Sequence, residues 1–191
     1  MKGQAPEAPT LTGTKVRLRP WEAADATSLE AACGDPDICR FTTVPRHYTP
    51  DQAESWIRRQ HDRIATGSAI VLAIEPTSLR RAVGMIGLFG LDEQPEVGRL
   101  GYWVVQSHRR ARIATEAVRV LAEWSFEQLG LTALNIDIEP NNEPSRRVAQ
   151  AVGAIHERQL SRLLDGQSRQ LERFTLHRQP LRPACNTRRT G

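Results

Sequence analysis

Basic residues gather where an expected strand leads into the longest expected helix of the chain. Residues 101–117 read GYWVVQSHRRARIATEA, with His108, Arg109, Arg110 and Arg112 in the turn. The first N–H groups of a helix have no partner within it, and the helix dipole is positive there, so such a terminus binds anions. The sequence therefore predicts an anion site here, suited to a pyrophosphate group.

A second polar turn, EPNNEPS at 139–145, lies between the next expected strand and helix. Asn142 and Ser145 fall just before that helix or in its first turn. Asn and Ser are favoured helix N-caps, because their side-chain oxygens accept a hydrogen bond from an unpaired backbone N–H. Taken alone, this turn indicates capping.

Hydrophobic periodicity and helix-stop residues define the elements that must position these turns. Strands are expected at 15–19, 68–75, 82–91, 96–106, 133–139, 154–163 and 169–177. Helices are expected at 21–33, from the N-cap Thr49 to Gly67, at 113–129 and at 142–152, and residues 34–48 are expected to form a loop. This order predicts an α+β (α/β layered) fold with a mixed sheet.

The order of elements, with the stretches GYWV…RRARIATEAV and PNNEPSRRV…GA, resembles the GNAT superfamily. Within it, the chain looks most like the RimJ/RimL-type branch of ribosomal-protein N-terminal acetyltransferases, over residues 12–178. The resemblance implies a mixed, mainly antiparallel seven-stranded sheet with helices on both faces. Its central strands, 96–106 and 133–139, would be splayed apart near a β-bulge.

The resemblance also implies a function. The protein would be an acyl-CoA-dependent N-acyltransferase that moves acetyl from acetyl-CoA to a primary amine by direct attack in a ternary complex. The amine would belong to a protein N-terminus or to a small molecule. By the same likeness, Ser145 is the catalytic residue that protonates or stabilises the departing thiolate.

The cofactor contacts follow from the same likeness. The family's turn reads R/Q-x-x-G-x-G/A, its backbone amides hold the CoA pyrophosphate, and the preceding strand end and an asparagine bind the pantetheine arm. The matching residues of this chain are Val104, Val105, Gln106, Arg109, Arg110, Ala111, Arg112, Ile113, Ala114, Thr115 and Asn142.

Two departures from the family pattern matter. Arg112 stands where the family has glycine; it could still offer its N–H to a phosphate if its φ is negative, and its guanidinium could add a contact. The glutamate that several relatives carry before GYW is absent, so no general base is assigned among the nearby carboxylates Glu96, Asp137 and Glu139. A non-catalytic CoA-binding or sensor module of the same fold is therefore the alternative.

The acceptor is constrained only by charge. The net charge is +4, and all but two of the 26 basic residues are arginine; this fits either a compositional bias of the source genome or attraction to an anionic partner, such as nucleic acid or a phosphorylated cofactor. No recognition helix or zinc spacing supports nucleic-acid binding. Acceptor contacts are expected from Phe41, His47, Tyr48 and Arg162. The loop 34–49 has only two acids, Asp35 and Asp37, which argues mildly against cationic antibiotics as acceptors.

The remaining expectations concern the whole chain. No apolar run is long enough to span a membrane, so a cytoplasmic protein is expected. The three cysteines suggest free thiols, and the scattered histidines suggest no metal site. Residues 1–11 are expected to be flexible, 12–178 to form a single domain and 179–191 a disordered tail. The protein is expected to be a monomer or a homodimer.

Overall fold

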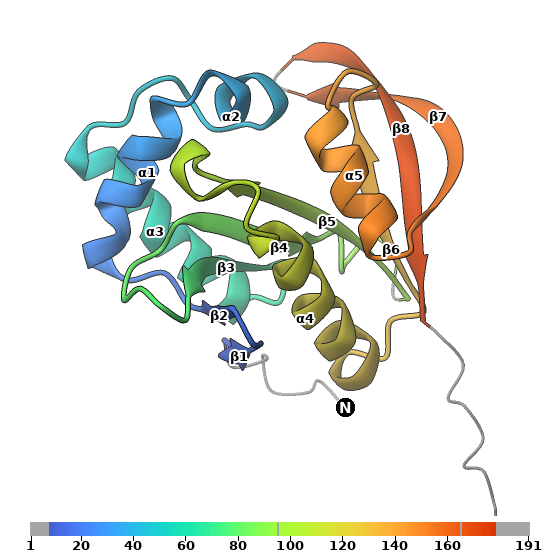
Figure 1. Cartoon of the computed structure of the whole chain (residues 1–191), viewed down its shortest axis with the longest axis horizontal. Coiled ribbons are helices and arrows are strands. Elements are labelled where there is room, and N and C mark those ends of the chain that lie inside the picture. The colour runs from blue at the N-terminus through green and yellow to red at the C-terminus, as the bar shows by residue number, and fades with distance from the viewer. Residues whose placement is uncertain (1–7, 95, 165, 179–191) are drawn as a thin grey trace, which may run out of the picture.

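The computed structural model describes residues 8–94, 96–164 and 166–178. They contain one eight-stranded sheet in the order β1-β2-β3-β4-β5-β6-β8-β7 (Figure 1). Neighbouring strands are antiparallel except for β5 and β6, which are parallel. The strands are β1 Leu11–Thr12, β2 Val16–Arg19, β3 Ala69–Pro76, β4 Gly84–Phe89, β5 Val97–Val104, β6 Ala133–Ile138, β7 Ile155–Leu164 and β8 Gln167–His177.

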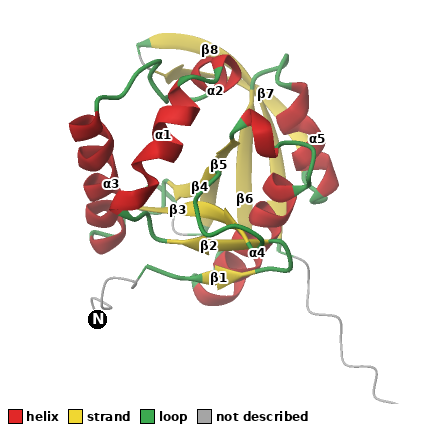
Figure 2. Ribbon diagram, turned by 60° about the vertical axis from the view of Figure 1, so that its left-hand side comes forward, coloured by secondary structure: helices red, strands yellow, loops and turns green. Residues whose placement is uncertain are grey.

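Helices cover both faces of the sheet, as expected (Figure 2). Buried residues of α1 and α3 pack on one face, and those of α4 and α5 pack on the other. No helix in the described part of the chain is long and apolar enough to cross a bilayer. The helices are α1 Ala26–Cys33, α2 Pro36–Phe41, α3 Pro50–Ala65, α4 Ile113–Gln128 and α5 Glu143–Ala151.

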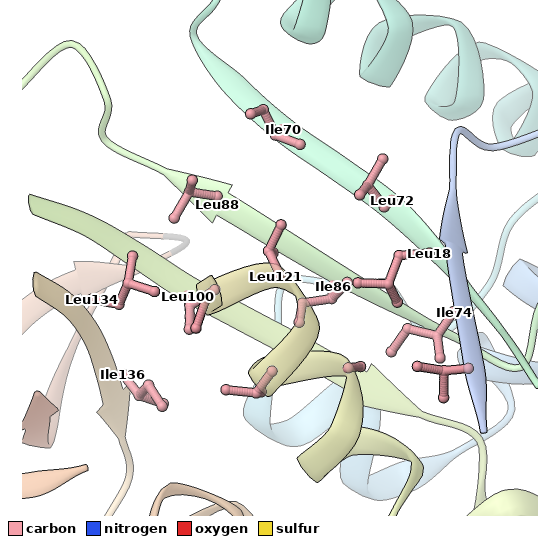
Figure 3. Packing of buried hydrophobic residues seen from close by; sticks show 14 of the residues in the cluster. Leu18, Ile70, Leu72, Ile74, Ile86, Leu88, Leu100, Leu121, Leu134 and Ile136 are labelled. Carbon is pink, nitrogen blue, oxygen red and sulfur yellow. The ribbon is translucent and has the colours of Figure 1, made fainter. Parts of the chain in front are cut away.

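Strand β3 lies at the centre of both hydrophobic layers. Its even-numbered residues from Ile70 to Ile74 belong to the cluster under α4 (Figure 3), and its odd-numbered residues from Ala69 to Ala73 face α1 and α3. All eight residues of β3 are buried. Coverage on both faces explains why this strand is apolar throughout rather than alternating.

The sheet has one strand more than expected. Leu11 and Thr12 form β1, which pairs with β2 through Leu11↔Leu18. Ala8 and Leu11 also pack against the cluster under α4. The expectation of a flexible segment is therefore wrong for Leu11, because a two-residue strand is too short to leave a periodic signal. The other expected terminal region, 179–191, and residues 1–7 lie outside the described residues.

The expected loop at 34–48 contains helix α2. Asp35 caps it, with its side chain accepting from the N–H groups of Asp37 and Ile38, and Pro36 occupies the first turn. Ile38 is buried against the cluster under α1 and α3. A helix of six residues carries too little periodicity to be found from sequence, although an Asp-Pro helix start was present.

The functional geometry begins where β5 and β6 separate. The two strands pair only from Val97↔Ala133 to Arg99↔Asn135. Across the sheet, β4 and β5 keep an unbroken register from Phe89↔Arg99 to Gly84↔Val104, so the β-bulge implied by the resemblance is absent from that ladder. The expected splay of the central strands is confirmed, and it arises because β6 turns away from β5.

A buried ion network joins β2 and β3 to the start of α1. The Arg19 guanidinium donates to both carboxylate oxygens of Asp25 at 2.7 and 2.9 Å, and to Glu75 at 2.7 Å. Burial alone would raise the pKa of Asp25, but the hydrogen bonds from Arg19 and from the Glu22 and Ala82 backbone outweigh it, and the pKa is lowered.

We expect Asp25→Ala to lower the free energy of unfolding by about 3–5 kcal/mol, because it leaves a buried cation with one of its two partners. Urea denaturation at neutral pH measures this. Arg17→Gln is the matched control: Arg17 lies 3.5 Å from the same Glu75 but is 47% exposed, and its loss should cost less than about 1 kcal/mol.

The difference in unfolding free energy between the wild type and Asp25→Ala should depend on pH, and the direction of that dependence follows from the pKa of Asp25. Because the folded-state pKa of Asp25 is lowered, its contribution is present above the unfolded-state value of about 4 and is lost as the pH falls through the folded-state value. The difference in stability between wild type and Asp25→Ala should therefore shrink in acid. A difference that does not change between pH 7 and pH 3 would contradict this assignment.

Candidate active site

A cavity of about 1850 Å³ opens where β5 and β6 diverge. Its wall comes from α2, β4 to β6, the basic turn, the first turns of α4 and α5, and the β7–β8 hairpin. Of the catalytic and cofactor-binding residues assigned from sequence, only Val105 and Ala111 are outside this wall. The assigned residues that line it are Val104, Gln106, Arg109, Arg110, Arg112, Ile113, Ala114, Thr115, Asn142 and Ser145.

The basic turn presents a run of unpaired backbone donors. In the described part of the chain, the N–H groups of 110–115 donate to no carbonyl or side chain. The next N–H along the chain, that of Glu116, donates to Arg112 O at 3.0 Å and makes the first hydrogen bond of the helix. These six groups surround the start of the sixteen-residue helix α4. An anion would there meet both free donors and the positive end of the helix dipole.

Arg112 has a left-handed backbone. Its φ is +62°, and that of Arg110 is +64°, so the negative φ considered from sequence for Arg112 does not occur. A non-glycine residue pays about 1–2 kcal/mol for this conformation. Arg112 is the N-cap of α4, a position that usually has an extended backbone, so the left-handed conformation is specific to this turn. Arg112 thus has the conformation that glycine favours, and left-handed residues in such turns build anion-binding nests.

The side chain of Arg109 is committed to protein partners. It donates to Val104 O at 3.0 Å, to Asp37 at 3.0 Å and to Asp35 at 2.5 Å. Its backbone N–H donates to Gln106 O. Arg109 therefore shapes the turn and fastens it to α2. Its backbone N–H and three of the five N–H donors of its guanidinium are engaged within the protein.

Helix α2 is fastened at its other end as well. The Arg169 guanidinium, on β8, donates to Arg40 O at 2.9 Å and to Glu139 at 3.0 Å. With Arg109 at the α2 N-terminus, one arginine from each side of the diverging strands holds the helix. Helix α2 therefore lies at the cavity, between the two halves of the sheet and next to β8 (Figure 1).

The free edge of β5 can be assigned from the ladder bonds. Val105 N–H donates to Val83 O, so Val105 faces β4 and is wrongly placed among the groups facing the gap. Because ladder bonds alternate along a strand, the backbone groups of Tyr102 and Val104 face the gap instead. Val104 O is taken by Arg109, which leaves the Tyr102 groups and Val104 N–H.

The second polar turn brings three side chains together. Asn142 Oδ1 accepts from the Ser145 N–H at 3.3 Å, so the capping expected from sequence is present. The Ser145 hydroxyl lies 2.9 Å from the hydroxyl of Tyr102, on the opposite side of the gap. Burial raises the pKa of Tyr102 to about 12, with the hydrogen bond to Ser145 acting against it. The phenol is therefore neutral at physiological pH.

The carboxylates considered as bases are mostly neutralised. Asp137 binds Arg173 at 2.7 and 2.9 Å and Arg162 at 2.9 Å, and Glu139 binds Arg169. Glu96 is exposed, stands next to the paired end of β5 and does not line the cavity. None of the three is an unpaired carboxylate at the gap.

The side of the cavity formed by α2, α3 and β4 carries two arginine–phenylalanine stacks. Arg40 lies 5.0 Å over Phe41, and Arg63 lies 5.6 Å over Phe89. All four residues line the cavity, as does Arg162, and neither stacked arginine has a carboxylate partner in the described residues. His47 and Tyr48, expected here from sequence, are absent from its wall.

No group of three potential metal ligands occurs in the part of the chain that the structure describes. Cys33 and Cys39 are free thiols, while Cys185 lies outside the described residues. Sequence reasoning missed two features of the site, the Tyr102 hydroxyl and the carboxylates that hold Arg109. The GYW motif pointed to Tyr102, but its partner Ser145 is 43 residues away and no periodic signal links them.

Comparisons with known proteins agree with this geometry. A family profile, the acetyltransferase (GNAT) domain, matches residues 15–155. The N-acetyltransferase p20 of Bacillus licheniformis is 25% identical over 143 residues, covering 75% of this chain and 80% of p20.

Two solved structures share the fold at lower identity. RimJ of Mycobacterium smegmatis, in complex with a CoA-disulfide, has a TM-score of 0.72 and 23% identity, over 85% of this chain and 81% of RimJ. RimL, the ribosomal L7/L12 alpha-N-protein acetyltransferase in complex with coenzyme A, has a TM-score of 0.76 and 14% identity, over 89% of this chain and 97% of RimL. The profile covers most of the chain and includes both polar turns, and this chain therefore belongs to the GNAT family of acetyltransferases.

Proposed function

We propose that this GNAT enzyme transfers an acetyl group from acetyl-CoA to a primary amine by direct attack within a ternary complex. The observation that carries the proposal is the run of free N–H groups at 110–115, all but Ala111 belonging to residues that line the same cavity as Ser145 and the open edge of β5. An anion cradle, an unpaired strand edge and a hydroxyl are what a pyrophosphate, a pantetheine amide and a departing sulfur require.

The pyrophosphate would bind at the start of α4. The six unpaired N–H groups supply the hydrogen bonds, and the helix dipole adds about half a positive charge. Arg110, Arg112 and Arg119 line the same region of the cavity, and none has a carboxylate partner in the described residues. Their charges would attract CoA over a distance set by the ionic strength.

The pantetheine arm would lie in the gap between β5 and β6. Its amides would pair with the gap-facing backbone of Tyr102 and Val104 and continue the sheet where β6 has turned away. The Asn142 amide NH₂ has no protein acceptor in the described residues, since only Oδ1 is used for capping, and it could donate to a pantetheine carbonyl.

Ser145 would stabilise the negative charge that develops on sulfur when the thioester breaks. Its hydroxyl lines the cavity at the first turn of α5, where the helix dipole also favours negative charge. Because the carboxylates at the gap are ion-paired, we assign the amine proton to water rather than to one of them.

The acceptor we propose is a peptide N-terminus with acidic residues near it. Arg40 and Arg63, each stacked on a phenylalanine, give this side of the cavity two cations without carboxylate partners, against one such carboxylate, Asp92. A polycationic antibiotic or a polyamine would meet like charge. One of the two arguments for the sensor alternative is weakened, because Arg112 has the left-handed backbone conformation that glycine favours.

Thiol release from acetyl-CoA tests the function. Four acceptors would be compared: a peptide with an acidic N-terminal sequence, the same peptide with lysines in place of the acids, a polyamine and an aminoglycoside. We expect turnover with the acidic peptide to exceed that with the other three. Acetyl-CoA binding in calorimetry without thiol release from any amine would favour the sensor module.

Ser145→Ala should lower kcat by about 100-fold, because a contact to developing charge is made mainly in the transition state. The Kd of CoA, measured by calorimetry, should change by less than about threefold. Equal losses in kcat and in CoA affinity would remove Ser145 from the chemical step.

Two substitutions of Asn142 separate capping from cofactor binding. Asn142→Ala should lower helix stability by about 1 kcal/mol and weaken CoA binding. Asn142→Asp keeps the cap oxygen but removes the NH₂ donor, so its thermal stability should match the wild type while CoA affinity falls about fivefold. If Asn142→Asp binds CoA as tightly as the wild type, capping is its sole role.

Arg112→Gly should raise stability by about 0.5–1 kcal/mol, since relief of left-handed strain exceeds the added chain entropy. It should weaken CoA binding about fivefold at low salt, and less at high salt, because one charge is lost. Arg112→Ala is the matched control: it loses the same charge but keeps the strain, so its affinity should fall without a gain in stability. Tighter CoA binding by Arg112→Gly would mean that the side chain obstructs the site.

A further inference from the structure

We propose that Tyr102 is a positioning residue for the acetyl transfer, which sets the direction of the Ser145 hydroxyl hydrogen so that it points at the sulfur of the thioester. The inference rests on the proposed role of Ser145 and adds a second residue to it. Tyr102 stands on β5 and Ser145 on α5, and their hydroxyls meet at 2.9 Å on the wall of the cavity.

The number of hydrogens at this contact defines the inference. Each hydroxyl has a single hydrogen, and the 2.9 Å contact uses one of the two. If the Ser145 hydroxyl donates to Tyr102, its hydrogen is not available to the sulfur, and the Tyr102 hydroxyl donates to the backbone carbonyl of Ser145 at 3.2 Å. If Tyr102 donates to Ser145 Oγ, the serine hydrogen is free for the sulfur. Tyr102 can therefore either withhold the serine hydrogen from the reaction or release it.

Negative charge on sulfur selects the second arrangement. During transfer the amine nitrogen forms a bond to the acetyl carbon, the carbon–sulfur bond breaks, and its electron pair stays on sulfur. The amine proton passes to water. Ser145 then donates to the thiolate, and Tyr102 donates to Ser145, so that two aligned hydrogen bonds stabilise the charge without any proton transfer between the three groups.

The surroundings of Tyr102 suit this role. The phenol ring packs against the cluster under α4, which fixes its position, and the two serine oxygens are the only partners of its hydroxyl in the described residues. Since burial raises the pKa of Tyr102 to about 12, the phenol keeps its hydrogen across the pH range of an enzyme assay. The backbone N–H and C=O of Tyr102 also face the gap, so this one residue contributes both the phenol hydroxyl and part of the open edge of β5.

Tyr102→Phe, Ser145→Ala and the double variant test the proposal. Tyr102→Phe should lower kcat about tenfold and leave the KM and Kd of acetyl-CoA within twofold. In the Ser145→Ala background the same change should lower kcat by less than twofold, because Tyr102 acts only through the serine. An equal tenfold loss in both backgrounds would overturn the proposal.

A measurement without turnover gives a second readout. Ultraviolet absorbance follows ionisation of the thiol of enzyme-bound CoA. Both Tyr102→Phe and Ser145→Ala should raise the pKa of the bound thiol, since each removes stabilisation of the thiolate. A thiol pKa that Tyr102→Phe leaves unchanged, with Ser145→Ala raising it, would also overturn the proposal.

Thr175→Val is the matched control for loss of a buried hydroxyl. Thr175 donates to Asn135 at 2.9 Å, and neither residue lines the cavity, so kcat and the thiol pKa should stay at wild-type values.

Failure of the proposed function and failure of the role of Tyr102 give different results. Absence of CoA binding and of transfer by the wild type would refute the proposed function, whereas active wild type with unchanged Tyr102→Phe would refute only the role of Tyr102.

Discussion

The separation of β5 and β6 is the constraint on which the rest of the structure depends. Two parallel strands that pair for three residues and then diverge expose the backbone polar groups of their facing edges. Exposed polar groups of this kind need either water or a partner. The gap also creates the space that the two polar turns enclose, because the basic turn follows β5 and the turn around Asn142 follows β6.

The rest of the fold supports the two halves of the sheet on either side of this gap. Strand β3, covered on both faces, anchors one half of the sheet, and the network of Arg19, Asp25 and Glu75 ties α1 to that half. The β6–β8–β7 ladder forms the other half. Helix α2, fastened by Arg109 and Arg169, joins the two halves, so the acceptor side and the cofactor side of the cavity are held in one arrangement.

Ion pairing divides the polar residues of the cavity into structural and available groups. The carboxylates of Asp137 and Glu139 and the guanidinium of Arg109 satisfy one another or their neighbours. In the described residues, the groups available to a ligand include the N–H run at 110–115, the guanidinium groups of Arg110 and Arg112, and the two hydroxyls of Tyr102 and Ser145, which are hydrogen-bonded to each other. The proposed reaction would rely on hydrogen bonds placed before the reaction rather than on an ionised side chain, and such groups are a large source of catalysis in acyl transfer.

The sequence by itself determined the type and order of every long element, because hydrophobic runs and helix boundaries such as Thr49 and Gly130 act locally. It also located both polar turns. Tertiary structure decided the contacts between distant residues: Tyr102 with Ser145, 43 positions apart, and Arg109 with Asp35, 74 positions apart. The positive φ of Arg112 belongs to this second class, since the local preference of arginine opposes that conformation and would not predict it from sequence.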